Sequence, residues 1–292
     1  MSFFARLFGR RASKDNNDRH SSRRGGDPLA EIRPQLDVLR AAGFHLKGAP
    51  TSSFARLGGL PLVPEGFVWP RYKESPLAFI CQIDLSEVPV IAGEPGLPTR
   101  GYLSVFYDQE QSTWGFDPAD RGSWRVFYWD VPRDALFPAA APIGLYEQAL
   151  FPAKPLSIVP IRTYPGDSTP LIETLLSEAQ FDAYFDLRDS VYVGEPSHHL
   201  LGYPDAIQGD HMEVECQLAS QGVYVGDGRG YRDERLADIR EGASDWRLLL
   251  QIDSDDDADF MWGDVGRLYF WIRRSDLARA HFDDVWMVLQ CS

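Results

Sequence analysis

Apolar residues in this chain are grouped in short runs of strand length, separated by turns that are rich in proline and glycine. Pro61, Pro64 and Pro70 exclude a helix from the first of these turn regions, because proline removes a helical hydrogen bond and clashes with the preceding turn. The compact runs, rich in aromatic and β-branched side chains, predict strands. The strands that we expect are residues 77–85, 102–107, 124–129, 157–161, 246–252, 267–272 and 285–289.

Helical periodicity is confined to a few short segments. Asp27 is placed to cap a helix that starts at Pro28 and ends at Gly43, since Pro favours the first helical position and Gly a helix end. Pro34 either kinks this helix or delays its start. The other helices expected are residues 170–179 capped by Ser168 or Thr169, residues 181–187 as a continuation or a second helix, and residues 233–241.

Three sequence blocks occur twice and in the same order, which predicts an internal duplication. The matching blocks are 57–61 with 200–204, 79–84 with 248–253, and 101–107 with 266–272. The duplication implies two related β-rich halves, about 54–129 and 199–290, that share one core, with an insertion carrying the charged helix in the second half. Gln82 and Gln251 occupy matching positions inside apolar strands. A buried amide needs hydrogen-bond partners, so we expect each to bind the backbone of its neighbouring Gly-Pro loop.

Composition favours one folded domain preceded by an N-terminal tail of basic and polar residues. The chain has 292 residues and 44% apolar residues, enough for a core over residues 28–292. No apolar run approaches the 18 residues of a membrane span. Cys81, Cys216 and Cys291 lack the spacing of zinc ligands and are too few for a disulfide scaffold, which suits a reducing cytoplasm. We expect no cofactor.

Charge is distributed unevenly along the chain. The whole protein has a net charge of −14, so its surface repels phosphate and double-stranded nucleic acid is excluded as a partner. Residues 1–27 are basic and polar, and we expect this tail to be disordered. Within residues 1–11, Phe3, Phe4, Leu7 and Phe8 share one helical face. This face predicts at most weak contact with an anionic membrane surface.

Five segments resemble the bacterial YwqG-like family, a family of unknown function. They are residues 57–70, 76–85, 199–208, 246–272 and 282–291, with the most specific similarity in 248–255 and 261–272. The resemblance covers roughly residues 30–292 and implies a mostly β, α+β fold. It brings no activity, cofactor or catalytic residue. Some members are thought to occur beside secreted-toxin genes, which implies an immunity role.

The acidic run after residue 252 resembles a functional site more than any other segment of the sequence does. Asp253, Asp255, Asp257 and Asp264 match the first, third, fifth and twelfth positions of a calcium loop. Ala258 replaces the glycine that such a loop needs at its turn, so we expect no metal site. The alternative is a solvated acidic hairpin that keeps a sheet edge from pairing with other chains.

Other candidate sites have weaker support. Gly166-Asp167-Ser168 resembles a hydrolase serine block, but the chain has no Gly-x-Ser-x-Gly elbow and no matching histidine, so no catalytic residue is predicted. His198 and His199 adjoin the second Gly-Tyr-Pro turn, where they either bind a ligand or hydrogen-bond the local backbone. Trp262 lies beside a glycine, where an aromatic platform can form. The candidate ligand-binding residues are His198, His199, Asp253, Asp255, Trp262 and Asp264.

Together these patterns predict an α+β, mostly β protein that binds without catalysis. The partner expected is a basic protein, in the sharpest form a toxin that an acidic immunity protein occludes. The alternative is a small-ligand-binding or metal-binding protein, or an enzyme, that uses the acidic loop and the histidines of the second half. The two hypotheses differ in one respect: the alternative requires Asp253, Asp264 and a histidine to line one concave pocket.

Overall fold

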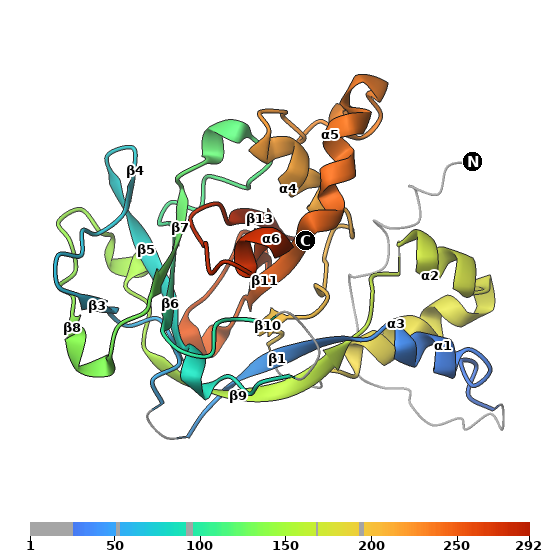
Figure 1. The fold of residues 1–292 in the computed structure, drawn as a ribbon, viewed down its shortest axis with the longest axis horizontal. Helices are drawn as coiled ribbons and strands as arrows, with labels where there is room; N and C mark the ends of the chain where they lie inside the picture. The colour runs from blue at the N-terminus through green and yellow to red at the C-terminus, as the bar shows by residue number, and fades with distance from the viewer. Residues whose placement is uncertain (1–25, 51–52, 92–95, 168, 193–195) are drawn as a thin grey trace.

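The computed structural model describes residues 26–50, 53–91, 96–167, 169–192 and 196–292. The expectations for residues 1–25, including membrane contact through 1–11, lie outside the described residues. Most strands belong to one large antiparallel sheet of 11 strands, in the order β13-β12-β11-β10-β1-β9-β2-β5-β6-β7 with β4 paired to β5 (Figure 1). The strands are β1 Ala41–Gly48, β2 Arg56–Leu57, β4 Arg71–Tyr72, β5 Ser75–Asp84, β6 Tyr102–Asp108, β7 Trp124–Trp129, β9 Lys154–Thr163, β10 His199–Leu201, β11 Trp246–Asp253, β12 Arg267–Arg273 and β13 Trp286–Gln290. A separate small sheet pairs β3 Leu62–Pro64 with β8 Leu136–Pro138.

All seven expected strands are present, but the helix expected from Pro28 to Gly43 is wrong over most of its length. Helix α1 covers only Arg33–Val38, with Pro34 in its first turn, so the proline delays the start of the helix. Strand β1 follows at once and pairs along its whole length with β9. Gly43 is a point of close approach rather than a helix end, because a Cβ atom there would lie 3.0 Å from the carbonyl oxygen of Leu200.

Strands β1 and β9 form the middle of the large sheet. β2, β5, β6 and β7 follow on the side of β9, and β10, β11, β12 and β13 follow on the side of β1. Gln82 of β5 lies opposite Arg56 and Ser104, whereas Gln251 of β11 lies opposite His199 and Tyr269. β5 and β11 each have a register irregularity, between Phe79 and Cys81 and between Leu248 and Leu250.

The large sheet is curled until it is nearly closed. Trp124 of β7 and Trp286 of β13 lie with ring centroids 4.9 Å apart. The Trp124 indole N–H donates to the carbonyl oxygen of Val285, at 2.8 Å. The two edge strands therefore meet around a shared aromatic core, in which each favourable ring pair adds about 0.5–1.5 kcal/mol beyond area burial.

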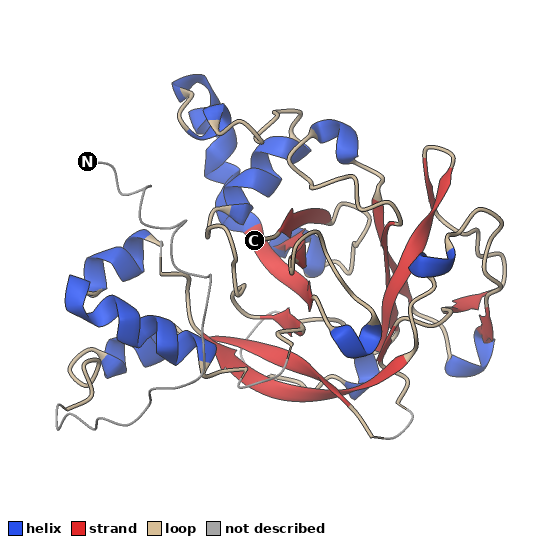
Figure 2. Cartoon of the chain, turned by 180° about the vertical axis from the view of Figure 1, so that it is seen from behind, coloured by secondary structure: helices blue, strands red, loops and turns tan. Residues whose placement is uncertain are grey.

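The helices lie in two groups outside the sheet. α1, α2 Pro170–Leu175 and α3 Phe181–Asp189 gather at one end of β1 and β9, around the buried Leu36 and Tyr184 (Figure 2). α2 is present as predicted but ends at Leu175 rather than residue 179, and of the two alternatives for residues 181–187 a second helix, α3, is the one observed. Thr169 is the N-cap residue of α2, without a side-chain hydrogen bond to the helix. α4 Met212–Ser220 and α5 Ala237–Glu241 accompany the second half, and α6 Arg274–Leu277 follows β12. Within the described ranges, no helix has the length and apolar character needed to cross a membrane.

Candidate functional site

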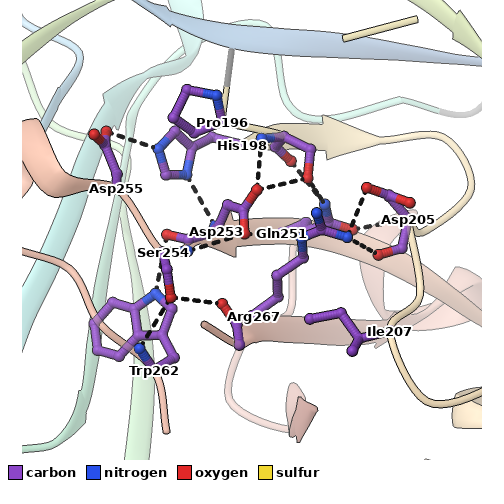
Figure 3. Close-up of polar contacts among 12 residues, drawn as sticks. Pro196, His198, Asp205, Ile207, Gln251, Asp253, Ser254, Asp255, Trp262 and Arg267 are labelled. Carbon is purple, nitrogen blue, oxygen red and sulfur yellow. Dashed lines mark hydrogen bonds and ion pairs between the residues drawn. The ribbon is translucent and has the colours of Figure 1, made fainter. Parts of the chain in front are cut away.

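The candidate residues of the second half converge where β10 begins and β11 ends. β10 pairs antiparallel with β11, with His199 opposite Gln251. Residues just before β10 therefore face residues just after Gln251, which brings Ser197 and His198 beside Asp253 and Asp255 (Figure 3). The sequence analysis named His198, Asp253 and Asp255 but not Ser197, and the strand pairing explains why the four residues meet.

His198 joins two acidic residues. Its Nδ1 accepts the backbone N–H of Asp253 at 2.9 Å, so in the neutral ring the proton is on Nε2, which lies 3.1 Å from Asp255 Oδ2. Lys154 Nζ, on β9, donates to both oxygens of Asp255 at 2.7 and 3.0 Å. Burial favours the neutral acid, but the hydrogen bonds from His198 and Lys154 prevail and lower the pKa of Asp255. The Asp255 carboxylate is therefore an internal counter-ion.

Asp253 is satisfied in the same way by a different set of groups. Its Oδ2 accepts the backbone N–H and the hydroxyl of Ser197, at 2.9 and 3.0 Å. Its Oδ1 accepts Arg267 Nε at 2.8 Å and the N–H of Ser254 at 3.0 Å. Arg267 also pairs with Asp205 at 2.6 Å. Burial opposes the charge on Arg267, yet Asp205 and Asp253 together raise its pKa.

Gln82 and Gln251 are both fully buried, as predicted. Gln251 accepts the N–H of Asp205 at 2.9 Å and donates to the carbonyl and hydroxyl oxygens of Ser197 at 2.7 and 2.8 Å. Gln82 accepts the N–H of Leu62 at 3.1 Å and donates to its carbonyl oxygen at 2.6 Å. Asp205 and Leu62 each follow the proline of a matching turn, so the prediction that both amides bind these loops is confirmed.

His199 is held by backbone and a tyrosine. Its Nε2 lies 3.1 Å from the carbonyl oxygen of Tyr203, and its Nδ1 lies 3.2 Å from the Tyr192 hydroxyl. Its Nδ1 also lies 3.0 Å from the carbonyl oxygen of Ser197. Burial lowers the pKa of His199 to about 4, so the ring is neutral at pH 7 and its single N–H donates to one of the two carbonyl oxygens. The sequence left two interpretations of His199 open, ligand binding or hydrogen bonding to the local backbone, and the contacts of the ring agree with the second.

The structure places Trp262 in the core and Asp264 on the surface. Trp262 is 1% exposed, packs against Phe260 with ring centroids 4.8 Å apart, and donates its indole N–H to the carbonyl oxygen of Asp253 at 3.1 Å. It is a core residue, because its ring lies under the acidic turn rather than at its surface. Asp264 is exposed on the turn before β12, outside the network that holds Asp253.

The acidic residues do not form a calcium loop. The carboxylates of Asp253 and Asp255 point to Arg267 and Lys154, which take the place that a cation would need. Ala258 is buried in a short 3-10 turn, and Asp259 carries the left-handed backbone with φ 53°. No group of three or more metal-ligating side chains was found in the part of the chain that the structure describes.

The exposed side of the acidic turn forms a shallow depression of about 500 Å³, lined mainly by Pro196, Asp256, Asp257, Met261 and Val265. Met261 is 46% and Val265 56% exposed. We call this surface the acidic face. Asp259 and Asp264 are exposed on the same turn. The face offers carboxylates and apolar side chains to solvent, whereas the polar groups beneath it are paired with one another.

Sequence reasoning missed the basic residues of the network, Lys154 and Arg267, and its third acid, Asp205. The available signal was the position of Asp253 at the end of an apolar strand, since a buried carboxylate requires a cation or several donors. That signal predicts that a partner exists, but it does not say which of 29 lysines and arginines it is.

Comparison with known families agrees with the extent of the β-rich region. A search among curated proteins finds no match. The family described as Domain of unknown function (DUF1963) matches residues 55–291, from just before β2 to just after β13. This match leaves out the basic tail, α1 and β1 and takes in the acidic face and the whole network beneath it. On this match, the chain belongs to the DUF1963 family, whose function is unknown.

Proposed function

We propose that this protein acts by non-catalytic binding of a basic protein partner through the acidic face. The observation that carries the proposal is the division of the acidic turn into two kinds of carboxylate. Asp253 and Asp255 are buried and neutralised internally, whereas Asp256 and Asp257 are exposed beside the apolar Met261 and Val265. Asp257 also contacts Lys154 at 3.3 Å, although its side chain is exposed. The internal pairs hold the turn in one shape, and Asp256 and the exposed side of Asp257 face a partner.

The chemistry of the acidic face suits a protein surface that combines lysine or arginine with apolar side chains. Exposed apolar groups at the centre of an interface supply most of its affinity. Surrounding carboxylates mainly increase the association rate and select for positive charge. The net charge of −14 extends this attraction beyond the contact itself. An immunity protein that occludes a basic toxin is the sharpest form of the proposal.

The alternative, an enzyme or a small-ligand binder built on the same residues, has less support. It needs Asp253, Asp264 and a histidine in one concave pocket. Asp253 is instead bonded to Ser197 and Arg267, and Asp264 lies apart from it on an exposed turn. A general base needs a free lone pair directed at the substrate, and the lone pairs of Asp253 and Asp255 are occupied by neighbours.

We infer further that the two halves arose by duplication. The sheet order supports this inference. On one side of the central strands β1 and β9 a short strand, β10, is followed by β11, β12 and β13, and on the other side a short strand, β2, is followed by β5, β6 and β7. The register irregularities also match, since each ends one residue before Gln82 or Gln251. Both glutamines bind the residue that follows a proline in a matching turn. Within DUF1963, we propose a YwqG-like protein of the bacterial cytoplasm, where its buried free cysteines stay reduced.

Affinity capture from the native host at low salt tests the binding proposal. The full-length protein is the bait, and the test variant combines Asp256→Lys with Met261→Ala. The matched control combines Asp238→Lys with Val68→Ala, two exposed residues away from the acidic face. We expect the wild type and the control to retain one basic protein that about 0.5 M salt releases, and the test variant to lose it. Capture of no basic protein by the wild type, or equal capture by both variants, contradicts the proposal.

A further inference from the structure

A carboxyl group of α4 is buried where a loop packs on the helix. Glu215 is 9% exposed. Its Oε1 accepts the hydroxyl of Tyr231 at 2.5 Å, and its Oε2 is buried without a hydrogen-bond partner among the described residues. Burial raises the pKa of Glu215 to about 7, and the hydrogen bond from Tyr231 offsets this effect only in part. In contrast to Asp253 and Asp255, this group is therefore not held in its ionised form at neutral pH.

The loop that carries Tyr231 has few other attachments to α4. We call residues 226–236, which precede α5, the Tyr231 loop. Gly230 is its one buried residue, and a Cβ atom there would lie 3.3 Å from a methyl carbon of Leu218 of α4. Within the described ranges, the contact between Tyr231 and Glu215 is the one hydrogen bond that joins the loop to α4. A change in the charge of Glu215 therefore acts directly on the attachment of the loop.

The arginines of the surrounding elements are engaged with other groups. Arg240 of α5 donates to the carbonyl oxygens of Gly230 and Asp233, at 3.1 and 2.7 Å. Arg273 at the end of β12 lies over the ring of Trp246, 4.5 Å from its centroid. Within the loop, the arginines pair with aspartates or are exposed: Arg229 with Asp227, Arg235 with Asp233, and the exposed Arg232. No cation of the described chain is among the groups that lower the pKa of Glu215.

Other titratable groups lie on α4 and just before it. They are Asp210, Glu213, Cys216 and His211, whose ring lies 6.2 Å from that of Tyr231. Burial raises the pKa of the Cys216 thiol, which is therefore neutral. Burial also raises the pKa of Glu213 to about 7, where Asp210 and Glu215 act in the same direction and Arg274 acts against them. Two such acids on one helix disfavour each other's ionisation, but of the two, Glu215 is the one bonded to the loop.

We propose that the hydrogen bond between Glu215 and Tyr231 is a proton-controlled latch, which holds the Tyr231 loop on α4 while Glu215 is protonated and releases it when Glu215 ionises. The neutral acid stays buried and keeps its contact with the tyrosine hydroxyl. An ionised carboxylate accepts several hydrogen bonds, and the single donor Tyr231 replaces only part of the water that it binds in solution. Opening of the loop lets water reach both oxygens. This inference goes beyond the proposed function, and no residue of the acidic face takes part in it.

The pH range of the latch follows from the protons that the closed and open loop bind. With the loop open, Glu215 is hydrated and titrates near its ordinary pKa of 4.5, whereas its pKa is about 7 with the loop closed. Between these values the closed state holds a proton that the open state has lost. The equilibrium constant for opening therefore increases with pH by up to about tenfold per pH unit, and it becomes constant above about pH 8.

Limited proteolysis with trypsin measures the open population, because Arg229, Arg232 and Arg235 are exposed cleavage sites within the loop. Full-length protein and the Glu215→Gln variant are digested in parallel at pH 6, 7 and 8, and cleavage within residues 226–236 is identified by mass spectrometry. Glutamine accepts the same hydrogen bond and does not ionise. The ratio of the wild-type cleavage rate to that of the variant cancels the pH dependence of trypsin itself. We expect this ratio to increase about tenfold from pH 6 to pH 8.

Three further variants separate the latch from general effects of charge. Glu234→Gln removes an exposed carboxylate of the same loop and should retain the wild-type increase. Glu213→Gln removes the other acid of raised pKa and should retain most of the increase. Tyr231→Phe keeps the ring and removes the hydroxyl, so its loop should be cleaved about fivefold faster than that of the wild type already at pH 6, where Glu215 is mostly protonated.

Each measurement can contradict the latch. A ratio that stays constant from pH 6 to pH 8 overturns the proposal. Loss of the increase in Glu213→Gln or Glu234→Gln also overturns it, because another carboxylate would then control the loop. Cleavage of Tyr231→Phe at the wild-type rate at pH 6 does so as well, since the hydroxyl would then not hold the loop. The acidic face takes no part in these measurements, so either proposal can fail while the other stands.

Discussion

Replacing Gln251 with leucine tests whether the buried amides hold the two strand-to-turn junctions in place. Gln251 is fully buried, and its amide group makes three hydrogen bonds, to the N–H of Asp205 and to both oxygens of Ser197. Leucine has a similar volume and no polar atoms. The change therefore removes hydrogen bonds and leaves the packing largely intact.

The loss of unfolding free energy depends on whether the groups that bind Gln251 find other hydrogen-bond partners after the substitution. The Ser197 hydroxyl keeps its bond to Asp253 Oδ2 at 3.0 Å. The N–H of Asp205 loses the Gln251 oxygen at 2.9 Å, and an orphaned buried donor costs about 1–3 kcal/mol. The two lost bonds to Ser197 add about 1 kcal/mol each, and burial of the extra apolar surface of leucine returns a similar amount. We expect Gln251→Leu to lower the free energy of unfolding by about 1–3 kcal/mol.

Urea unfolding followed by tryptophan fluorescence measures this change. Gln221→Leu is the matched control, because Gln221 is exposed at the end of α4, and exposed substitutions stay within about 0.5 kcal/mol. Gln82→Leu should cost at least as much as Gln251→Leu, since Gln82 also binds Arg56 and Ser104, at 3.0 and 2.7 Å. A loss below about 0.5 kcal/mol for Gln251→Leu would refute the reasoning, and a large loss for the control would make the assay uninformative about burial.

Three further predictions concern the charged groups. Burial raises the pKa of Glu215 from 4.5 to about 7. Between these two pH values the folded protein holds a proton on Glu215 that the unfolded chain has lost. The contribution of Glu215 to the free energy of unfolding therefore falls as the pH rises from 4.5 to 7. Glu215→Gln is therefore expected to gain up to about 3 kcal/mol on the wild type between pH 5 and pH 8, measured by urea unfolding. The pKa of Asp255 is instead lowered, with Lys154 as one cause, so its stabilisation is present above pH 4 and lost below it. Lys154→Met should cost about 1–3 kcal/mol at pH 7 and almost nothing near pH 2 in thermal unfolding, and an equal deficit at both values would contradict this origin. Calorimetric titration with calcium should show no site tighter than about 1 mM, and a micromolar isotherm that Asp253→Asn abolishes would overturn our account of the acidic turn.

Local sequence patterns were sufficient for seven of the strands but not for every element. Most of these seven strands, such as β5, β6 and β11, are continuous buried apolar runs, so their signal is local. β1 was missed because Gly43 resembles a helix end, whereas its role depends on the backbone of Leu200. Helix α4 was missed because Glu213 and Glu215 interrupt its apolar face, and both carboxylates are largely buried.

The candidate site was predicted in part for a similar reason. Asp253 and Asp255 are neighbours in the sequence, and His198, 55 residues before Asp253, marks the other strand of the pair through which they meet. Their cations are remote: Lys154 precedes Asp255 by 101 residues. No local pattern joins residues at that separation. Sequence alone therefore indicated where the carboxylates lie, but it could not show that Asp253 and Asp255 are neutralised internally.

The central position of β1 has a consequence for how the protein forms during synthesis. Its partner β9 ends at Thr163 and its other partner β10 at Leu201, so β1 leaves the ribosome with neither strand yet made. At about 5–20 residues per second, the 115 residues from Gly48 to Thr163 take roughly 6–23 s to translate. During that time β1, apolar and unpaired, is a target for chaperones and for association between nascent chains. The last step is the meeting of Trp124 and Trp286, which requires β13, so we expect the sheet of the nascent protein to stay open until β13 has been synthesised.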